Sequence, residues 1–325
     1  MPEITDRPPD YVRDEIAQLR SALDAIPTKE VDRNLLVATW NIRHFGDLTR
    51  KWRSTAQDSP KRDLHSLICI AEIISRFDVI ALQEVKANLR AFRHMIKYLG
   101  PNWAFLMTDE TKGYRGNGER MAFVFDTRKV QLSGLACELV IPEDPKKPRQ
   151  HSLERQFART PYAVGFNSGG KTFILVTLHV IYGQNPENRK PELEAIAAWL
   201  ADWALDLNSW DHNLIALGDF NIDRRGDELY DAFTSTGLRS PDELDEVPRT
   251  IFSDPTKPDK HKFYDQIAWF TGVDGKPALS MEYKDVAGGF DFIPYVLQNR
   301  GLSKQQLSWH ISDHNPLFVE FEIQQ

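Results

Sequence analysis

The stretch Leu214-Ile-Ala-Leu-Gly-Asp-Phe-Asn221 joins a continuous apolar run to two polar side chains. The four apolar residues before Gly218 are typical of a strand buried on both faces of a sheet. Side chains two residues apart in an extended chain point the same way, so Asp219 and Asn221 should face one cleft at the carboxyl end of this strand, where open α/β sheets bind ligands. The alternative is an Asx-type turn, in which both side chains only bond nearby backbone amides.

The composition indicates a globular chain with no strong charge bias. The 325 residues are 41% hydrophobic and carry a formal net charge of −7, so only local basic loops could contact a polyanion. The cysteines Cys69 and Cys137 imply no disulfide framework and no metal-ligand pair, and both are expected to be buried apolar groups. The Pro-rich, acidic N-terminus does not resemble a signal peptide, and no run has the length of a membrane span. We therefore expect a cytoplasmic protein with no membrane partner.

Residues 1–30 are expected to form a disordered lead, up to Pro9, and then an amphipathic helix, whereas residues 31–325 form one further domain. From Val12 to Ile26 the apolar residues recur at spacings of four and three, which predicts the helix. Too few heptads are present for a coiled coil, so the helix should dock on its own domain rather than form a dimer seam. The oligomeric state stays open, with a monomer slightly favoured.

Apolar runs and amphipathic segments alternate through the remainder of the chain. Strands are expected at residues 35–40, 79–83, 103–107, 121–125, 162–166, 172–178, 214–217, 263–270 and 317–323, and helices at 61–76, 87–99 and 191–207. Pro191 suits the first turn of the last helix. Residues 142–150, with three prolines and the cations Lys146, Lys147 and Arg149, predict an irregular basic loop.

Polar side chains with ligand atoms recur at the ends of these apolar strands. The set is Asn41, Glu84, Glu119, His179, Asp219, Asn221, Asp313 and His314. Recurrence at the ends of four strands is hard to explain by solvation alone. A set rich in oxygen ligands, with two histidines and no thiol, suits Mg²⁺, Mn²⁺ or Ca²⁺ better than structural zinc.

Seven short motifs lie in order along residues 35–323. They are Trp40-Asn-Ile-Arg-His-Phe-Gly46, Leu82-Gln-Glu-Val85, Glu119-Arg120, Leu178-His179, Gly218-Asp-Phe-Asn221, Tyr264-Asp265 and Ser312-Asp-His314. In this order they resemble the endonuclease/exonuclease/phosphatase superfamily, and its DNase I branch most. The resemblance implies that residues 31–325 are the family's catalytic domain. It also implies a four-layer α/β sandwich, with two mixed β-sheets face to face and helices outside.

The resemblance implies a metal site and a water-positioning pair. Glu84 would be the main metal ligand, supported by Asn41, with Asp313 as a further acid on the metal side. Asp219 and Asn221 would position the attacking water and the phosphate, or a second metal. This is consistent with phosphate-ester hydrolysis, in which a cation neutralises charge that develops on the phosphoryl oxygens.

The resemblance also implies two histidine–carboxylate pairs and a phosphate contact. His314 would lie beside the scissile phosphate, with Asp265 as its orienting carboxylate. His179 and Glu119 would form the second pair, which is specific to the DNase-like branch. Arg159, in Phe157-Ala-Arg-Thr-Pro161, would contact phosphate. A carboxylate beside a histidine fixes the ring's tautomer and favours its charged form.

Substrate contacts are the least specific part of the sequence. At the two positions that the DNase branch uses in the minor groove, an arginine and a tyrosine, this chain has Lys86 and Asn117, with Tyr114 and Arg115 nearby. Lysine is a weaker stacking and bidentate group than arginine. Basic residues that could meet a polyanion, or be ordinary solvated charges, are Arg43, Lys86, Arg115, Lys146, Lys147, Arg224 and Arg225.

Several residues have plain structural alternatives. Arg43 and His44 could only pack or cap beneath the site, and Asp313 could chiefly hold its own turn. Three further histidines are expected at the surface rather than as ligands: His212, His261 and His310. Because every motif lies beyond residue 35, the N-terminal helix should be dispensable for chemistry.

The leading interpretation is a divalent-metal-dependent phosphodiesterase that hydrolyses DNA with little sequence preference, so its partner would be DNA. A second is a phosphatase or phosphodiesterase acting on inositol phosphates or phospholipids, although no apolar hairpin for membrane insertion is evident. A third is a non-catalytic binding module of the same fold. The intact set of candidate site residues argues against this third interpretation, since a binding module has no chemical need for all of them.

Overall fold

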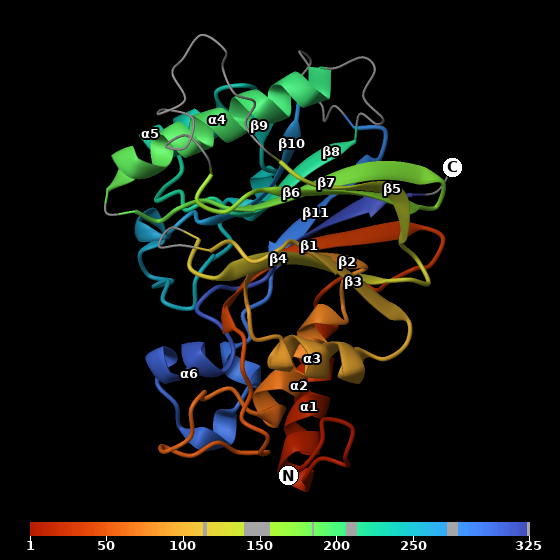
Figure 1. The fold of residues 1–325 in the computed structure, drawn as a ribbon, viewed down its shortest axis with the longest axis vertical. Helices are drawn as coiled ribbons and strands as arrows, with labels where there is room; N and C mark the ends of the chain where they lie inside the picture. The colour runs from red at the N-terminus through yellow and green to blue at the C-terminus, as the bar shows by residue number, and fades with distance from the viewer. Residues whose placement is uncertain (113–115, 140–156, 184, 206–212, 272–278, 324–325) are drawn as a thin grey trace.

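The protein consists of two six-stranded sheets packed face to face (Figure 1). The computed structural model describes residues 1–112, 116–139, 157–183, 185–205, 213–271 and 279–323. The first sheet contains, in order, β11 (Glu282–Gly289), β12 (Leu317–Glu322), β1 (Asn34–Phe45), β2 (Val79–Lys86), β4 (Glu119–Asp126) and β3 (Trp103–Met107). The second contains β5 (Gln131–Glu138), β6 (Tyr162–Ser168), β7 (Lys171–His179), β8 (Leu214–Asp219), β10 (Asp265–Phe270) and β9 (Leu238–Arg239).

Helices cover the outer faces of both sheets, which makes four layers (Figure 1). Below the first sheet lie α1 (Asp10–Leu23), α2 (Leu64–Ile74), α3 (Arg90–Leu99) and α6 (Lys304–His310). Above the second lie α4 (Pro186–Leu205) and α5 (Glu228–Thr234). Short 3₁₀ turns are η3 (Asp242–Leu244), η4 (Pro258–Lys260), η5 (Ile293–Tyr295) and η6 (Gln298–Arg300). Each sheet is mixed, because β1–β2 and β7–β8 are parallel and the other pairs are antiparallel. The predicted fold class is confirmed.

The continuous apolar runs are explained by burial on both sides of each sheet. In β1, Leu35 and Val37 point into the core between the sheets, whereas Leu36, Ala38 and Trp40 pack with the helices below. This alternation follows from the two-residue period of a strand. A sheet covered on both faces needs apolar residues at every position, as buried parallel strands do.

Several element boundaries differ from the sequence prediction. β1 and β2 do not end before Asn41 and Glu84 but continue to Phe45 and Lys86, with register shifts that mark bulges. α4 begins at Pro186, so Pro191 lies inside the helix rather than in its first turn. There it gives up one backbone hydrogen bond. β5, β9, β11, α5 and α6 were missed, since the strands are partly exposed or very short and the helices have only seven residues.

The N-terminal segment is packed rather than disordered. Ile4 is 1% exposed and shares a hydrophobic cluster with α1 and α2, so the expectation of a disordered lead before Pro9 is wrong. The predicted amphipathic helix is present as α1, and it buries Val12, Leu19 and Leu23 within the same cluster. A division of the chain into residues 1–30 and 31–325 stays a prediction.

The structure also shows how buried the two cysteines are and whether any described helix could cross a membrane. Cys69 is buried, whereas Cys137 is only half-buried because it lies on the partly exposed strand β5; both thiols are free. Among the described residues, no helix combines the length and the apolar character that a membrane crossing requires.

A buried polar network joins α1 to the C-terminal part of the chain. Glu15, which is 6% exposed, accepts hydrogen bonds from the backbone N–H groups of Leu297, at 2.5 Å, and Gln298, at 3.1 Å. Its Oε1 also lies 2.9 Å from His65 Nε2 on α2. On the other side of that ring, Arg300 Nη2 lies 3.2 Å from His65 Nδ1. The helix is therefore fixed by polar contacts as well as by apolar packing.

We expect Glu15→Ala to lower the free energy of unfolding by roughly 3 kcal/mol, because removal of one member of a buried charged network leaves the others unpaired. The matched control is Asp24→Ala at the end of the same helix, whose side chain is 73% exposed beside Arg76. Its loss should cost no more than about 0.5 kcal/mol. Denaturant unfolding of both variants checks this, and equal effects would contradict the role given to the network.

Candidate functional site

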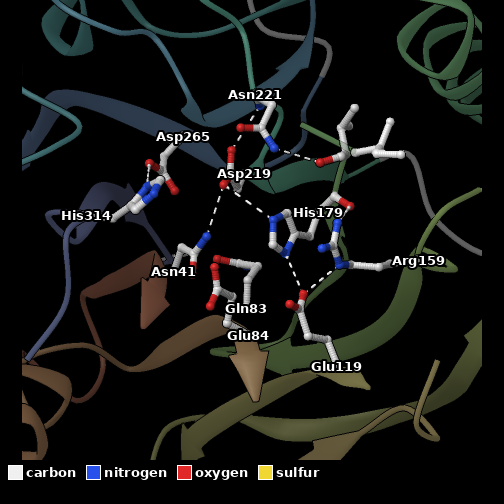
Figure 2. A network of polar contacts seen from close by, with 12 residues as sticks. Asn41, Gln83, Glu84, Glu119, Arg159, His179, Asp219, Asn221, Asp265 and His314 are labelled. Atoms are coloured by element: carbon white, nitrogen blue, oxygen red, sulfur yellow. Dashed lines mark hydrogen bonds and ion pairs between the residues drawn. The ribbon is translucent and has the colours of Figure 1, made fainter. Parts of the chain in front are cut away.

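The polar residues predicted from the strand ends converge at one edge of the sandwich (Figure 2). Asn41 and Glu84 lie near the carboxyl ends of the parallel pair β1 and β2, and His179 and Asp219 at the carboxyl ends of β7 and β8. Glu119 and Asp265 are the first residues of β4 and β10, which run antiparallel to their neighbours. The carboxyl ends of the parallel strands and the amino ends of their antiparallel neighbours therefore meet at the same edge.

Gly218 allows β8 to approach β7 closely enough to align the two strands. Its φ is +141°, and a Cβ at this position would lie 2.1 Å from the carbonyl oxygen of Leu178. A side chain there would separate the strands. In the observed register His179 is opposite Asp219, so this glycine places an imidazole beside a carboxylate.

Four other residues of the site region have left-handed backbone. His44, Glu84, Asn117 and Asn221 have φ values of 46°, 60°, 55° and 52°. Such conformations are costly for residues other than glycine and cluster at functional sites. The carboxylate of Glu84 compensates in part, since its Oε2 accepts a hydrogen bond of 2.9 Å from the His44 N–H.

Asp219 is the hub on the side of the second sheet. Its Oδ1 accepts from the Asn221 N–H at 2.9 Å, and its Oδ2 accepts from Asn41 Nδ2 at 3.0 Å and lies 3.6 Å from His179 Nε2. The side chain of Asn221 donates to the Val180 carbonyl at 2.7 Å. The Asx-type turn and the site are therefore both present, because one carboxylate oxygen closes the turn and the other faces the site.

His314, which is half-buried, forms a close pair with the buried Asp265. His314 Nδ1 lies 2.6 Å from Asp265 Oδ2, and Asp265 is fully buried. Burial raises the pKa of Asp265 above its ordinary range. Burial alone would lower the pKa of His314, but the carboxylates of Asp265 and Asp219 raise it well above the ordinary value. The ring is therefore charged at neutral pH, and Nδ1 is committed to Asp265, which leaves Nε2 for a ligand.

On the side of the site away from His314, the Glu119 carboxylate contacts several cationic side chains. Its carboxylate lies 2.9 Å from Lys86 Nζ, 2.5 Å from Arg159 Nε and 3.1 Å from His179 Nδ1, and it accepts from Asn117 Nδ2 at 2.7 Å. Burial opposes ionisation of Glu119, but His179, Arg159 and Lys86 together hold its pKa well below the usual range. Lys86 and Arg159 are thus brought into the site on a shared carboxylate.

Ser312 fastens the last motif to β1. Its hydroxyl donates to the Asn41 carbonyl at 2.6 Å and accepts from the N–H groups of Arg43, at 3.2 Å, and His314, at 3.1 Å. Sequence reasoning gave Ser312 no role of its own. A small hydroxyl residue beside two candidate site residues was the available signal.

Arg43 and Asp313 lie at the margin of this arrangement. Arg43 donates to Ser308 Oγ at 2.7 Å, lies 3.5 Å from Asp313 Oδ2 and places its guanidinium 3.8 Å from the ring centre of Trp309. The Asp313 carbonyl accepts from the Thr250 hydroxyl at 2.7 Å. Both residues therefore hold local structure, and both side chains are also partly exposed beside the site.

Gln83 is a site residue that the sequence reasoning missed. It is fully buried, and its Nε2 donates to Thr177 on β7 at 2.9 Å and to Thr39 on β1 at 3.1 Å. This amide bridges the two sheets directly behind the site. A polar residue in an otherwise apolar strand, next to Glu84, was the signal that could have identified it.

The remaining predicted residues lie away from this cluster. Arg224 is exposed, and Arg225 forms an ion pair with Asp245. His261 is partly exposed. The expectation that His310 is a surface residue is wrong: it is 5% exposed, because the end of α6 faces α2 and its Nδ1 lies 3.1 Å from Ser66 Oγ. Tyr114, Arg115, Lys146, Lys147, Arg149 and His212 lie outside the described residues.

The oxygen ligands of the site suit a hard divalent cation. Among the described residues, the buried Oδ1 atoms of Asn41 and Asp265 have no hydrogen-bond partner. The carboxylate of Glu84 lies near Asn41, whose side-chain amide also donates to Asp219 (Figure 2). Unsatisfied buried oxygens beside several carboxylates favour a cation of the Mg²⁺ or Mn²⁺ type.

Comparisons with known proteins agree with this fold. A family model described as "Endonuclease/Exonuclease/phosphatase family" matches residues 38–279. The chain is 28% identical to a protein named Deoxyribonuclease-1 from Canis lupus familiaris, over 88% of this chain and 90% of that protein. It is also 28% identical to a Deoxyribonuclease of Thioalkalivibrio sp. (strain K90mix), over 58% of this chain but only 46% of that protein. Among solved structures, an endonuclease/exonuclease/phosphatase from Bacteroides vulgatus has a TM-score of 0.55 at 18% identity, over 89% of this chain and 98% of that one.

We expect millimolar Mg²⁺ or Mn²⁺ to raise the melting temperature of the protein by several degrees, because a ligand that binds only the folded state stabilises it by mass action. Glu84→Gln keeps the side-chain shape but removes charge, so it should need a higher metal concentration for the same shift. The control is Asp259→Asn at the exposed turn η4. Thermal scans against metal concentration decide the matter, and equal titrations for all three proteins would contradict a cation site at Glu84.

Proposed function

The chain belongs to the endonuclease/exonuclease/phosphatase family, and we propose that it is a divalent-metal-dependent phosphodiesterase that cleaves DNA internally with little sequence preference. The observation that carries this proposal is the pair of histidine–carboxylate units, His314 with Asp265 and His179 with Glu119, on either side of Asp219. Two imidazole groups that flank one carboxylate suit a phosphodiester, which needs positive charge around it and a base for the attacking water.

Asp219 is the group best placed to hold and deprotonate the water. Its Oδ1 is fixed by the Asn221 N–H, while Asn41 and His179 orient the Oδ2 that faces the site. Water attack on phosphorus forms the new P–O bond as the bond to the leaving oxygen breaks, and the water proton passes to Asp219. Positioning of this kind supplies a large part of the barrier reduction in such reactions.

The two histidines meet the phosphate from either side. Asp265 and Glu119 each hold a ring through Nδ1, so each Nε2 is directed toward the substrate space. These N–H groups stabilise charge on the phosphoryl oxygens, and one supplies the proton that the leaving oxygen takes. Arg159 adds charge from its position on Glu119. Glu84 and Asn41 Oδ1 would hold the cation, which when bound neutralises charge on the phosphoryl oxygens.

Support for DNA as the substrate comes from the relatives and from the rim of the site. Two relatives are named deoxyribonucleases, although at 28% identity. On the His314 side, the Tyr264 ring lies 5.9 Å from the His314 ring. Tyr182, which is 54% exposed, packs on the buried Arg189, with 4.6 Å between its ring centre and the guanidinium. Aromatic side chains are surfaces on which nucleic acid strands stack their bases.

We expect EDTA to abolish cleavage of supercoiled plasmid and Mg²⁺ or Mn²⁺ to restore it, with nicked circles as the first product. A site at the open edge of two sheets gives access to a closed circle, which has no ends. Gel analysis of supercoiled plasmid, linear duplex and RNA across a metal panel measures this. Consumption of linear DNA alone would indicate an exonuclease. Activity confined to inositol phosphates or phospholipids would overturn the choice of DNA.

We expect His314→Ala to reduce the plasmid-nicking rate by about 10²- to 10⁴-fold at every metal concentration, because extra cation cannot replace a group that acts on the phosphate itself. Asp265→Asn should give a smaller loss, since it misorients His314 without removing it. Glu84→Gln should recover in part at high metal concentration. Initial rates against Mg²⁺ concentration separate these cases. A His314→Ala enzyme that is rescued by metal would disprove the assignment.

A further inference from the structure

A cavity of about 550 Å³ lies beside the site on the side of the first sheet. Arg43, His44, Lys86 and Trp309 contribute to its walls, so it is formed by the end of β1, the end of β2 and α6. Its volume is within the range of small-molecule sites. None of the roles argued above for the catalytic groups uses this cavity.

The cavity contains an exposed aromatic pair with a cation against it. Trp309 is 41% exposed, and its ring lies 5.7 Å from that of His44 at an interplanar angle of 39°. The guanidinium of Arg43 lies 3.8 Å from the centre of the indole. A large aromatic residue so exposed on a short helix has no role in core packing. It provides a flat surface for another planar group.

This pair is held rigidly by a buried arginine. Arg62, which is 2% exposed, donates to the carbonyls of Arg43 at 2.7 Å and His44 at 2.9 Å. It also donates to the carbonyls of His310 at 3.1 Å and Ile311 at 2.9 Å, directly after Trp309. One side chain therefore fixes the end of β1 against the end of α6. A binding surface that is ordered before its ligand arrives loses less entropy on binding.

Residues of the cavity wall contact residues of the proposed catalytic site. The His44 N–H donates to Glu84 at 2.9 Å, and Lys86 reaches from the cavity wall to Glu119 at 2.9 Å. Arg43 lies 3.5 Å from Asp313, the neighbour of His314. A nucleic acid strand held at the site by one phosphate would therefore place an adjoining nucleotide in this cavity.

We propose that Trp309 and His44 form a stacking platform for a nucleobase next to the scissile phosphate, with Arg43 and Lys86 beside the adjoining backbone. The proposal rests on the proposed function. Every base has a π-face, so stacking on aromatic side chains binds a strand without selecting its sequence. Proteins bind unstacked bases in this way, which means that the base facing Trp309 leaves its neighbours in the strand.

The test is an abasic scan of short single-stranded oligonucleotides, with a wholly abasic oligonucleotide as a diester chain that carries neither a base nor any other aromatic ring. For the wild type, one abasic position next to the cleaved bond should raise KM about tenfold, the order expected for one stacked base. Trp309→Ala should raise KM about tenfold on the normal strand, leave kcat nearly unchanged and show no further penalty at that abasic position. Trp309→Phe should recover most of the loss. Hydrolysis of the baseless diester should be the same for all variants.

The matched control is Phe105→Ala on the edge strand β3, which removes an aromatic residue of nearly equal exposure, 42% against 41%. It should leave KM unchanged. If oligonucleotides are cleaved but Trp309→Ala keeps the abasic penalty, the platform is wrong and the proposed function stands. If the wild type cleaves neither these oligonucleotides nor plasmid, both fall. A Trp309 effect confined to sugar phosphates would also overturn the nucleobase assignment.

Discussion

The apolar core between the two sheets is the constraint on which the site depends. It presses the parallel pair β1–β2 against the parallel pair β7–β8, with Val37, Phe123, Phe166 and Leu217 among its buried members. Because the two pairs end at the same edge, their polar ends are forced together. Gln83 secures this arrangement through its hydrogen bond to Thr177 across the sheets. The site is thus a consequence of sheet packing rather than of any single loop.

Bringing these ends together concentrates buried charged groups, and opposite charges lie beside one another. Glu119 stays ionised because Lys86, Arg159 and His179 surround it. The charge on His314 is held by Asp265 in the same way. Pairs of this kind are costly to bury and contribute little to stability. Their presence, together with left-handed backbone at Glu84 and Asn221, is better explained by chemistry than by folding.

A second layer of buried polar groups fixes the frame around the site. Arg62 holds the end of β1 to the end of α6, and Ser312 holds the last motif to Asn41. Further out, Glu15 and His65 connect α1 to the segment before α6. These contacts span long distances in sequence. Segments from the first and last parts of the chain therefore shape the surroundings of Asp219, although Asp219 itself lies in neither segment.

Elements with strong local signals could be predicted from the sequence alone. Continuous apolar runs predicted the central strands, and polar residues at their ends predicted which carboxylate, amide and histidine side chains would gather at one edge, because a buried strand leaves few positions where such residues can be tolerated. Which of these groups touch one another follows from the way the two sheets pack. Asp219 contacts Asn41, and Glu119 contacts Arg159, across sequence separations that no local period encodes. The bulges at Asn41 and Glu84, the bridge formed by Gln83 and the burial of His310 arise from packing between distant segments. The periodicity of a sequence predicts which face of a strand a side chain occupies. The residue that it contacts on that face depends on how distant segments pack.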